Sequence, residues 1–219
     1  MLKLMGSDHF ELPTQDSVRK ACQHFDTDEE TKLIEPALTD LFAKYPSNTS
    51  ESQVRLKVVT LNDLYATRIP IHARNVPNVF DLAKCIPTLN VDQALKECSL
   101  QIVNTISTTQ FHEKKRINRF AFATKYASWH KQDIYPMWDG RVQNYLTCLR
   151  KRHRTEWDNF SDGFPLSSND WGYLEFHALI VRFRAHFNLT GVSFKNLDKF
   201  LWWHGRGNSG GSGMAAGQN

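Results

Sequence analysis

Two residues near the middle of the chain have side chains that can take part in covalent chemistry. Lys125 lies in an apolar helical pattern between Ala123 and Ala127. Apolar surroundings lower the pKa of a lysine amine, which can then act as a nucleophile. Asp139 follows after a turn that contains aromatic residues and proline. A carboxylate held at such a place can stabilise the cation that develops on a sugar when a glycosidic bond breaks.

Asp139 also has a purely structural explanation. The segment Tyr135-Pro-Met-Trp138 favours a non-helical turn, and a helix is expected to follow over residues 140–149. Aspartate is one of the preferred N-cap residues of a helix. The helix dipole keeps such a carboxylate ionised, so capping and catalysis are compatible, and spacing alone does not choose between them.

The surroundings of this pair are basic. Residues 110–154 contain eleven Lys or Arg and three Asp or Glu, a net charge of +8, whereas residues 1–52 contain five and ten, a net charge of −5. A local positive excess attracts a polyanion, although a solvated helix face would have the same composition. Aromatic residues that can stack on bases are interleaved with the cations, which favours a nucleic-acid interface. They are Phe111, Phe120, Phe122, Tyr126, Trp129, Tyr135 and Trp138.

Composition excludes several other classes of protein. Hydrophobic residues make up 41 % of the 219 residues, as in ordinary globular proteins. No apolar run approaches the roughly 20 residues that span a bilayer, and residues 1–6 are too short for a signal peptide core. The four cysteines and nine histidines lack metal-site spacing, so we expect reduced thiols, no metal and no cofactor. We expect a monomer in the cytoplasm.

Helical periodicity runs along the chain, with no alternating strand pattern of any length. The sequence therefore predicts an all-α fold. The helices are expected near residues 15–25, 29–44, 51–67, 78–86, 114–129, 140–149 and 195–203.

Two further helices are predicted, one after Asn90 and one after a cap at residues 168–170. Asn90 and Gln93 have the spacing of a capping box. The residues expected to face the core are Ala94, Cys98 and Ile102 in the first helix and Leu174, Ala178, Val181 and Ala185 in the second.

The charge pattern and composition also suggest a division of the chain. Residues 1–50 are interpreted as an acidic N-terminal helical extension, and residues 51–204 as the main helical domain. Residues 205–219 form a Gly/Ser-rich tail that is predicted to be disordered.

The segment 110–145 resembles the helix-hairpin-helix superfamily of DNA glycosylases. Members carry a hairpin that leads into a Lys-x-Ala element and an apolar helix, then a loop and a catalytic aspartate at the head of the next helix. Lys125-Tyr-Ala127 is similar to the Lys-x-Ala element, and Asp139 to the aspartate. Residues 118–124 replace the Gly-x-Gly of the hairpin. The resemblance implies a two-lobed helical fold with a degenerate hairpin and a cleft between the lobes.

A bacterial branch of 8-oxoguanine-type glycosylases, found among phage-defence genes, is more closely similar. The resemblance covers about residues 55–204, with its motifs in order. These are Leu61-Asn62-Asp-Leu-Tyr65-Ala-Thr67, Phe122-Ala-Thr-Lys125-Tyr126, Tyr135-Pro-Met-Trp-Asp139 and Leu197-Asp-Lys-Phe-Leu-Trp202.

The resemblance implies an enzyme that flips a modified base out of double-stranded phage DNA and cleaves its N-glycosidic bond. Glucosylated hydroxymethylcytosine is one such base. Asp139 would stabilise the cationic sugar or activate water, and Lys125 would attack C1′ or assist electrostatically. Residues expected to bind the substrate are Asn62, Tyr65, Arg68, Trp129, His130, Tyr135 and Trp138, and residues expected to bind DNA are Lys114, Lys115, Arg116, Arg119 and Arg141.

Two other functions fit the same residues. One is a repair glycosylase that acts on oxidised purines, and the other is a non-catalytic DNA-binding module. Asn62 and Tyr65 also have structural explanations, as a polar contact and a core aromatic residue, and aromatic side chains are more often core than ligand contacts.

Overall fold

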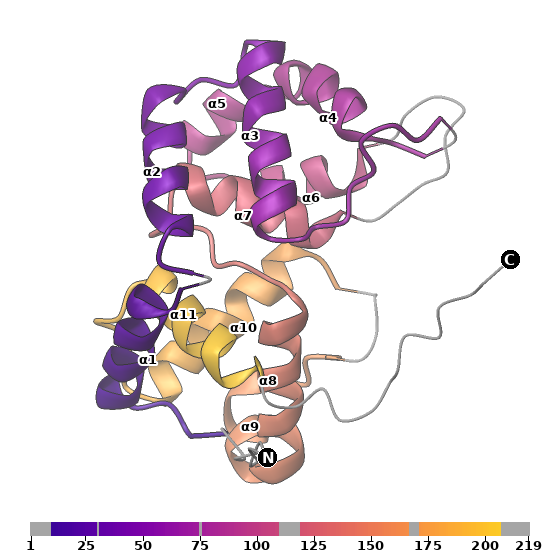
Figure 1. Ribbon diagram of the computed structural model, residues 1–219. Coiled ribbons are helices and arrows are strands. Elements are labelled where there is room, and N and C mark those ends of the chain that lie inside the picture. The colour runs from indigo at the N-terminus through magenta and orange to yellow at the C-terminus, as the bar shows by residue number, and fades with distance from the viewer. Residues whose placement is uncertain (1–9, 30, 75, 110–118, 167–170, 207–219) are drawn as a thin grey trace, which may run out of the picture.

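The computed structural model describes residues 10–206 except 30, 75, 110–118 and 167–170, and all regular structure in this part is helical (Figure 1). The all-α prediction is confirmed. None of the described helices has the length and apolar character that crossing a bilayer requires. The helices are α1 (Gln15–Thr27), α2 (Ile34–Lys44), α3 (Glu51–Leu64), α4 (Val79–Cys85), η1 (a 3-10 helix, Ile86–Thr88), α5 (Val91–Lys96), α6 (Gln101–Thr108), α7 (Phe120–His130), α8 (Gly140–Arg152), α9 (Arg154–Ser161), α10 (Tyr173–His186) and α11 (Phe194–His204).

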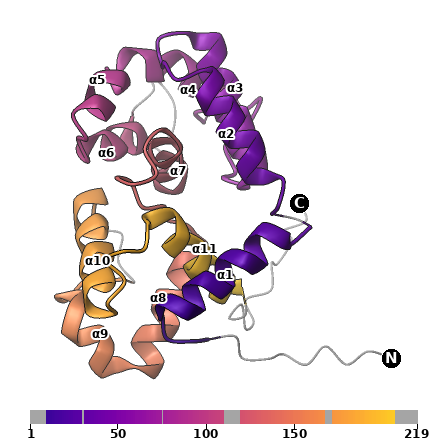
Figure 2. The ribbon, with the colours of Figure 1, turned by 90° about the vertical axis from the view of Figure 1, so that its left-hand side faces the viewer.

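The helices form two groups, which Figures 1 and 2 show one above the other. The upper group is α2 to α7, in which α3 packs on α4 and α6 packs on α7. The lower group is α1 and α8 to α11, in which α11 contacts both α1 and α8. A single cluster of buried apolar residues includes members of both groups. The chain crosses from the upper to the lower group between α7 and α8, and Asp139 is the last residue of that crossing.

The two N-terminal helices contribute to the same core. Val18 and Ala21 of α1 are buried, as are Leu38 and Phe42 of α2. Helix α1 packs along α11, and α2 packs against α3 and α7. The division of the chain at residue 50 stays a prediction.

The inward face of α10 differs from the predicted stripe. Leu174 and Val181 are 48 % and 44 % exposed, whereas Phe176 and Phe183 are fully buried. The two phenylalanine rings pack against other aromatic rings. Aromatic side chains bury large areas and dominate core energetics, so they set the rotation of the helix and the predicted stripe is wrong.

The predicted caps of α5 and α10 also differ from the structure. Asn90 precedes α5 with φ +52°, in the left-handed region, and its side chain makes no capping hydrogen bond. A capping side chain normally requires extended backbone, so the capping-box prediction is wrong. Cys98, with φ +55°, lies between α5 and α6 and is exposed rather than inward. The N-cap of α10 is Gly172, and residues 168–170 lie outside the described residues.

A network of polar side chains connects several elements of the upper group of helices, and His130 belongs to it. Lys57 of α3 is fully buried; its ammonium donates to Asn48 Oδ1 at 2.7 Å and lies 3.4 Å from His130 Nε2. Asn48 Nδ2 in turn donates to Asp92 Oδ1 at 2.6 Å. Burial, together with the charge of Lys57, lowers the pKa of His130 to about 3, and burial lowers the pKa of Lys57 to about 8. The network therefore keeps His130 neutral near neutral pH.

Replacing His130 should make the free energy of unfolding depend less on pH in the acidic range. The unfolded chain binds a proton at the ordinary histidine pKa of 6.5, whereas the folded chain does so only near a pKa of about 3. Stability is therefore complete above the unfolded pKa and is lost as the pH falls through this window. We expect His130→Gln to lose less free energy of unfolding than the wild type between about pH 6.5 and about pH 4, measured in urea. Replacement of the exposed His72 by Gln should retain the wild-type slope, and an equal slope in both variants would contradict the prediction.

Gly205 sets how closely the end of α11 approaches α8. A β-carbon at this position would lie 2.1 Å from the carbonyl oxygen of Arg141. Because that obstacle is backbone, Gly205→Ala should displace one helix and lower the free energy of unfolding by about 1–3 kcal/mol, measured in urea. At Gly191 a β-carbon would meet nothing within 4 Å. Gly191→Ala should stay within about 0.5 kcal/mol of the wild type, and equal stability of the two variants would disprove the packing argument.

Candidate functional site

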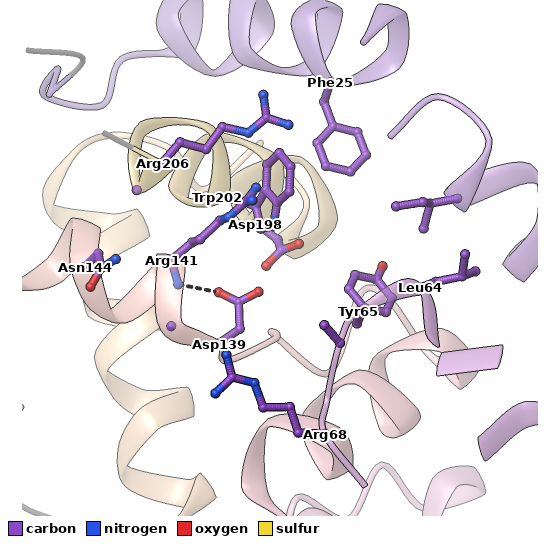
Figure 3. Close-up of a pocket in the computed structure, with 14 residues that line it drawn as sticks. Phe25, Leu64, Tyr65, Arg68, Asp139, Arg141, Asn144, Asp198, Trp202 and Arg206 are labelled. Carbon is purple, nitrogen blue, oxygen red and sulfur yellow. Dashed lines mark hydrogen bonds between the residues drawn. The ribbon is translucent and has the colours of Figure 1, made fainter. Parts of the chain in front are cut away.

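A cavity of about 540 Å³ is bordered by helices of both groups (Figure 3). The upper group contributes the first residue of α2, the end of α3 and the turn that follows it. The lower group contributes Phe25 of α1, the start of α8, and α11 from its second turn to the residues just after its end. The residues that line the cavity are Phe25, Ile34, Leu64, Tyr65, Ala66, Arg68, Asp139, Gly140, Arg141, Asn144, Asp198, Trp202, Gly205 and Arg206.

Asp139 lies on the wall of this cavity as the N-cap of α8, as its sequence context predicts. Its Oδ1 accepts hydrogen bonds from the backbone N–H groups of Arg141 at 2.9 Å and Val142 at 3.0 Å. The side chain is 20 % exposed, and its Oδ2 lies 3.4 Å from Lys125 Nζ. One carboxylate oxygen is thus fixed by the helix, and the other is paired with a lysine.

Lys125 lies behind Asp139 and does not line the cavity. Its side chain is 2 % exposed, and Nζ donates to the carbonyl oxygen of Trp138 at 3.1 Å as well as to Asp139. Nζ also lies 5.2 Å from the centre of the Tyr65 ring. The structure therefore brings Lys125 and Asp139 into contact, with the amine on the side of the carboxylate away from the cavity.

Asp198 is a second carboxyl group in the cavity and was not among the predicted site residues. Figure 3 shows its carboxyl group directed toward Asp139. Burial raises the pKa of Asp198 to about 7; Lys195 opposes this effect, and the charge of Asp139 adds to it. The sequence signal was present, because Asp198 belongs to the Leu197-Asp-Lys-Phe-Leu-Trp202 motif that carries the resemblance.

Three guanidinium groups give the cavity a cationic side. The guanidinium carbon of Arg141 lies 3.6 Å from the centre of the Trp202 ring, and that of Arg206 lies 4.0 Å from it. Arg68 lines the cavity from the other group of helices. Its φ of +60° and that of Ala66, +46°, place both residues in the left-handed region. Such strained turns concentrate at functional sites and persist only where surrounding contacts hold them.

Asn62 supplies those contacts and does not itself line the cavity. Its Nδ2 donates to the carbonyl oxygen of Ile69 at 2.9 Å. Its Oδ1 accepts from Thr67 Oγ1 and from the backbone N–H of Ile69, each at 2.8 Å. These bonds span the turn that carries Arg68, so the structural explanation for Asn62 holds and a direct contact with a base edge does not fit.

Most of the predicted stacking residues lie in the core. Trp129, Tyr135 and Trp138 are at most 8 % exposed and do not line the cavity. His130 belongs to the network with Lys57 and does not line it either. The predictions for these four residues as direct substrate contacts in this cavity are not supported by their positions. The three aromatic side chains are buried, and the partly exposed His130 borders a different pocket, beside Phe42. Of the predicted aromatic residues that the structure describes, only Tyr65 lines the cavity, and Phe111 lies outside the described residues. Phe25 and Trp202 line it and were missed.

Of the predicted DNA-binding residues, one lines the cavity, one is buried and three lie outside the described residues. Arg141 lines the cavity. Arg119 is only 6 % exposed and donates to the carbonyl oxygen of Thr109 at 2.7 Å, so it lacks the accessible position of a phosphate contact. Lys114, Lys115 and Arg116 lie outside the described residues.

The part of the chain that the structure describes holds no group of three or more His, Cys, Asp or Glu residues arranged to bind a metal ion. The polar groups that face the cavity are instead carboxyl, guanidinium and amide groups. The guanidinium groups can bind the phosphate groups of a ligand, and the carboxyl and amide groups can form hydrogen bonds with its hydroxyl groups. The charged groups can also stabilise an opposite charge on the ligand.

Comparisons with known proteins place the N-terminal part of the chain in a family. The family model HI_0787_N, described as an N-terminal domain, matches residues 17–134, more than half of the chain. An uncharacterized protein of Haemophilus influenzae is 28 % identical over 149 residues, which cover 66 % of this chain and 62 % of that protein. No solved structure matches. The matched family segment contains Lys125 and ends before Asp139 and Asp198. The chain belongs to the HI_0787_N family.

Proposed function

We propose that this chain is a DNA glycosylase that flips a modified base out of double-stranded DNA, cleaves its N-glycosidic bond and leaves an abasic site. The observation that carries the proposal is the position of Asp139. It is a helix-capping carboxylate on a cavity wall, with a buried lysine 3.4 Å behind it. An aspartate at the head of a helix is the catalytic element that the resemblance to helix-hairpin-helix glycosylases implies.

In this reaction Asp139 acts on the sugar. Departure of the base leaves positive charge on C1′ and the ring oxygen, and an ionised carboxylate stabilises that charge. The two backbone N–H groups and Lys125 hold the carboxylate in position before the reaction begins. Pre-oriented charge of this kind needs no reorganisation at the transition state.

The two groups of helices would serve as the two lobes of the glycosylase, with the cavity as the cleft between them. The resemblance puts the degenerate hairpin at residues 118–124, but residues 120–124 are the first turns of the helix α7, so we do not assign a hairpin to these residues. Arg68, Arg141 and Arg206 line the cavity and would hold the phosphates of the extruded nucleotide. Extrusion costs a few kcal/mol of stacking and pairing energy, which such phosphate contacts would offset.

A polar substituent on the base suits the cavity. Its walls offer two carboxyl groups, three guanidinium groups and the amide of Asn144, all of which can bind hydroxyl groups. We therefore favour a hydroxyl-rich modified base, such as glucosylated hydroxymethylcytosine in phage DNA, over an oxidised purine. The biological role that follows is antiviral defence.

The purified chain should release a base from duplex DNA that carries glucosylated hydroxymethylcytosine. Asp139→Asn should slow this release at least about 100-fold, because asparagine lacks the charge that stabilises the sugar cation. Asparagine can keep the capping hydrogen bonds. Its amide does not replace the charge beside the buried Lys125, so urea unfolding must show that the variant is folded under the assay conditions. The measurement is alkaline cleavage at abasic sites in labelled oligonucleotides, with 8-oxoguanine, uracil and unmodified cytosine as comparison substrates.

The control is Asp133→Asn, which removes an exposed carboxylate that does not line the cavity and should keep the wild-type rate. Salt-dependent DNA binding by Asp139→Asn shows that the variant still engages its substrate. Binding without abasic sites on any substrate would overturn the enzyme proposal in favour of a DNA-binding module. Release confined to 8-oxoguanine would replace the proposed substrate with an oxidised purine.

Lys125 should act on Asp139 and not on the sugar. Its side chain is 2 % exposed and does not line the cavity, which does not favour attack on C1′. We expect sodium borohydride to trap no covalent complex with DNA, whereas a bifunctional glycosylase run in parallel should be trapped. Lys125→Met should retain slow base release. A borohydride-trapped complex that disappears in Lys125→Met would instead identify Lys125 as a nucleophile that forms a Schiff base.

A further inference from the structure

The cavity brings together two carboxyl groups from different helices. Asp139 caps α8, and Asp198 lies in the second turn of α11. The two helices pack against each other, and Figure 3 shows the two carboxyl groups directed toward one another. Two acids that flank one reacting bond can divide the work of glycosidic cleavage between them.

The two carboxyl groups differ in their surroundings: one has polar partners and the other has none among the described residues. Asp139 accepts two backbone hydrogen bonds and pairs with Lys125. Among the described residues, no side chain or backbone N–H group forms a hydrogen bond or an ion pair with the carboxyl group of Asp198. A desolvated carboxyl group beside a carboxylate retains its proton more readily. When two carboxyl groups differ in this way, the one that keeps its proton can act as the acid in the reaction.

The charges around Asp198 come from five helices. Burial has the largest effect on its pKa and raises it to about 7; lysine charges lower the pKa, and carboxylate charges raise it. Arg141 and Arg206 line the same cavity from α8 and the end of α11. The groups that interact with Asp198 are Lys195 of α11, Asp139 at the head of α8, Lys125 of α7, Glu35 of α2 and Tyr65 at the end of α3.

We propose that Asp198 is the general acid of the reaction and donates its proton to the departing base. This inference rests on the proposed glycosylase function. As the bond between C1′ and the base nitrogen breaks, its electron pair leaves with the base, and the proton of Asp198 is transferred to that base. Water then adds its oxygen to C1′, and the proton that the water loses returns to Asp198.

The test compares the wild type, Asp198→Asn and the control Asp133→Asn on the duplex from which the wild type releases a base. Single-turnover rates are measured over about two pH units on either side of neutrality. The wild-type rate should fall as the pH rises above the pKa of Asp198, about 7, because the acid is then deprotonated. Asp198→Asn should be slower by about 100-fold at low pH and should lack this decline. Asp198→Glu should recover part of the rate with its pH dependence.

A second measurement shows, independently of activity, at what pH the carboxyl group of Asp198 loses its proton. In protein labelled with carbon-13 at aspartate carboxyl groups, one resonance should titrate near neutral pH, be absent in Asp198→Asn, and titrate at lower pH in Asp139→Asn. If the wild type releases a base but Asp198→Asn keeps its rate and pH profile, the role of Asp198 is overturned and the glycosylase proposal stands. If the wild type releases no base from any duplex, the proposed function fails and the role of Asp198 fails with it, whatever the titration shows.

Discussion

The junction between α7 and the head of α8 is the constraint on which the cavity depends. Lys125 is buried in α7, and its ammonium donates to the carbonyl oxygen of Trp138 and to the carboxylate of Asp139. The first N–H groups of α8 hold the other oxygen of that carboxylate. Separating α7 from α8 would leave a buried ammonium without partners, which costs about 3–5 kcal/mol. The position of Asp139 is therefore tied to the packing of the upper group of helices.

The acidic N-terminal helices act on the same cavity through α11. Lys199 Nζ lies 2.7 Å from Asp26 of α1 and 2.8 Å from Glu35 of α2, and Lys195 Nζ lies 3.1 Å from Glu35. Both lysines are nearly buried, and the carboxylates offset the cost of removing them from water. Part of the negative charge of residues 1–52 is thus paired within the fold. Because α11 also carries Asp198, these ion pairs help to position the second carboxyl group of the cavity.

The cationic side of the cavity is held by different contacts. Arg141 and Arg206 lie over the ring of Trp202, which restrains two long side chains that would otherwise be mobile. Arg68 is presented by a turn with left-handed residues, which the amide of Asn62 closes. In both places a neighbouring residue limits the freedom of an arginine. Less conformational entropy would then be lost if these arginines bound the phosphates of the proposed substrate.

Short-range patterns in the sequence determined the helical class, the N-cap role of Asp139 and the apolar setting of Lys125, because helical periodicity and capping depend on residues a few positions apart. They did not determine which aromatic residues are covered: Trp138 lies directly before Asp139 in sequence and is nevertheless buried. Only the tertiary structure decided that Asp198, fifty-nine positions after Asp139, shares its cavity. The packing of α11 on α8, and the loss of water that raises the pKa of Asp198, arise from contacts between distant segments that no local pattern specifies.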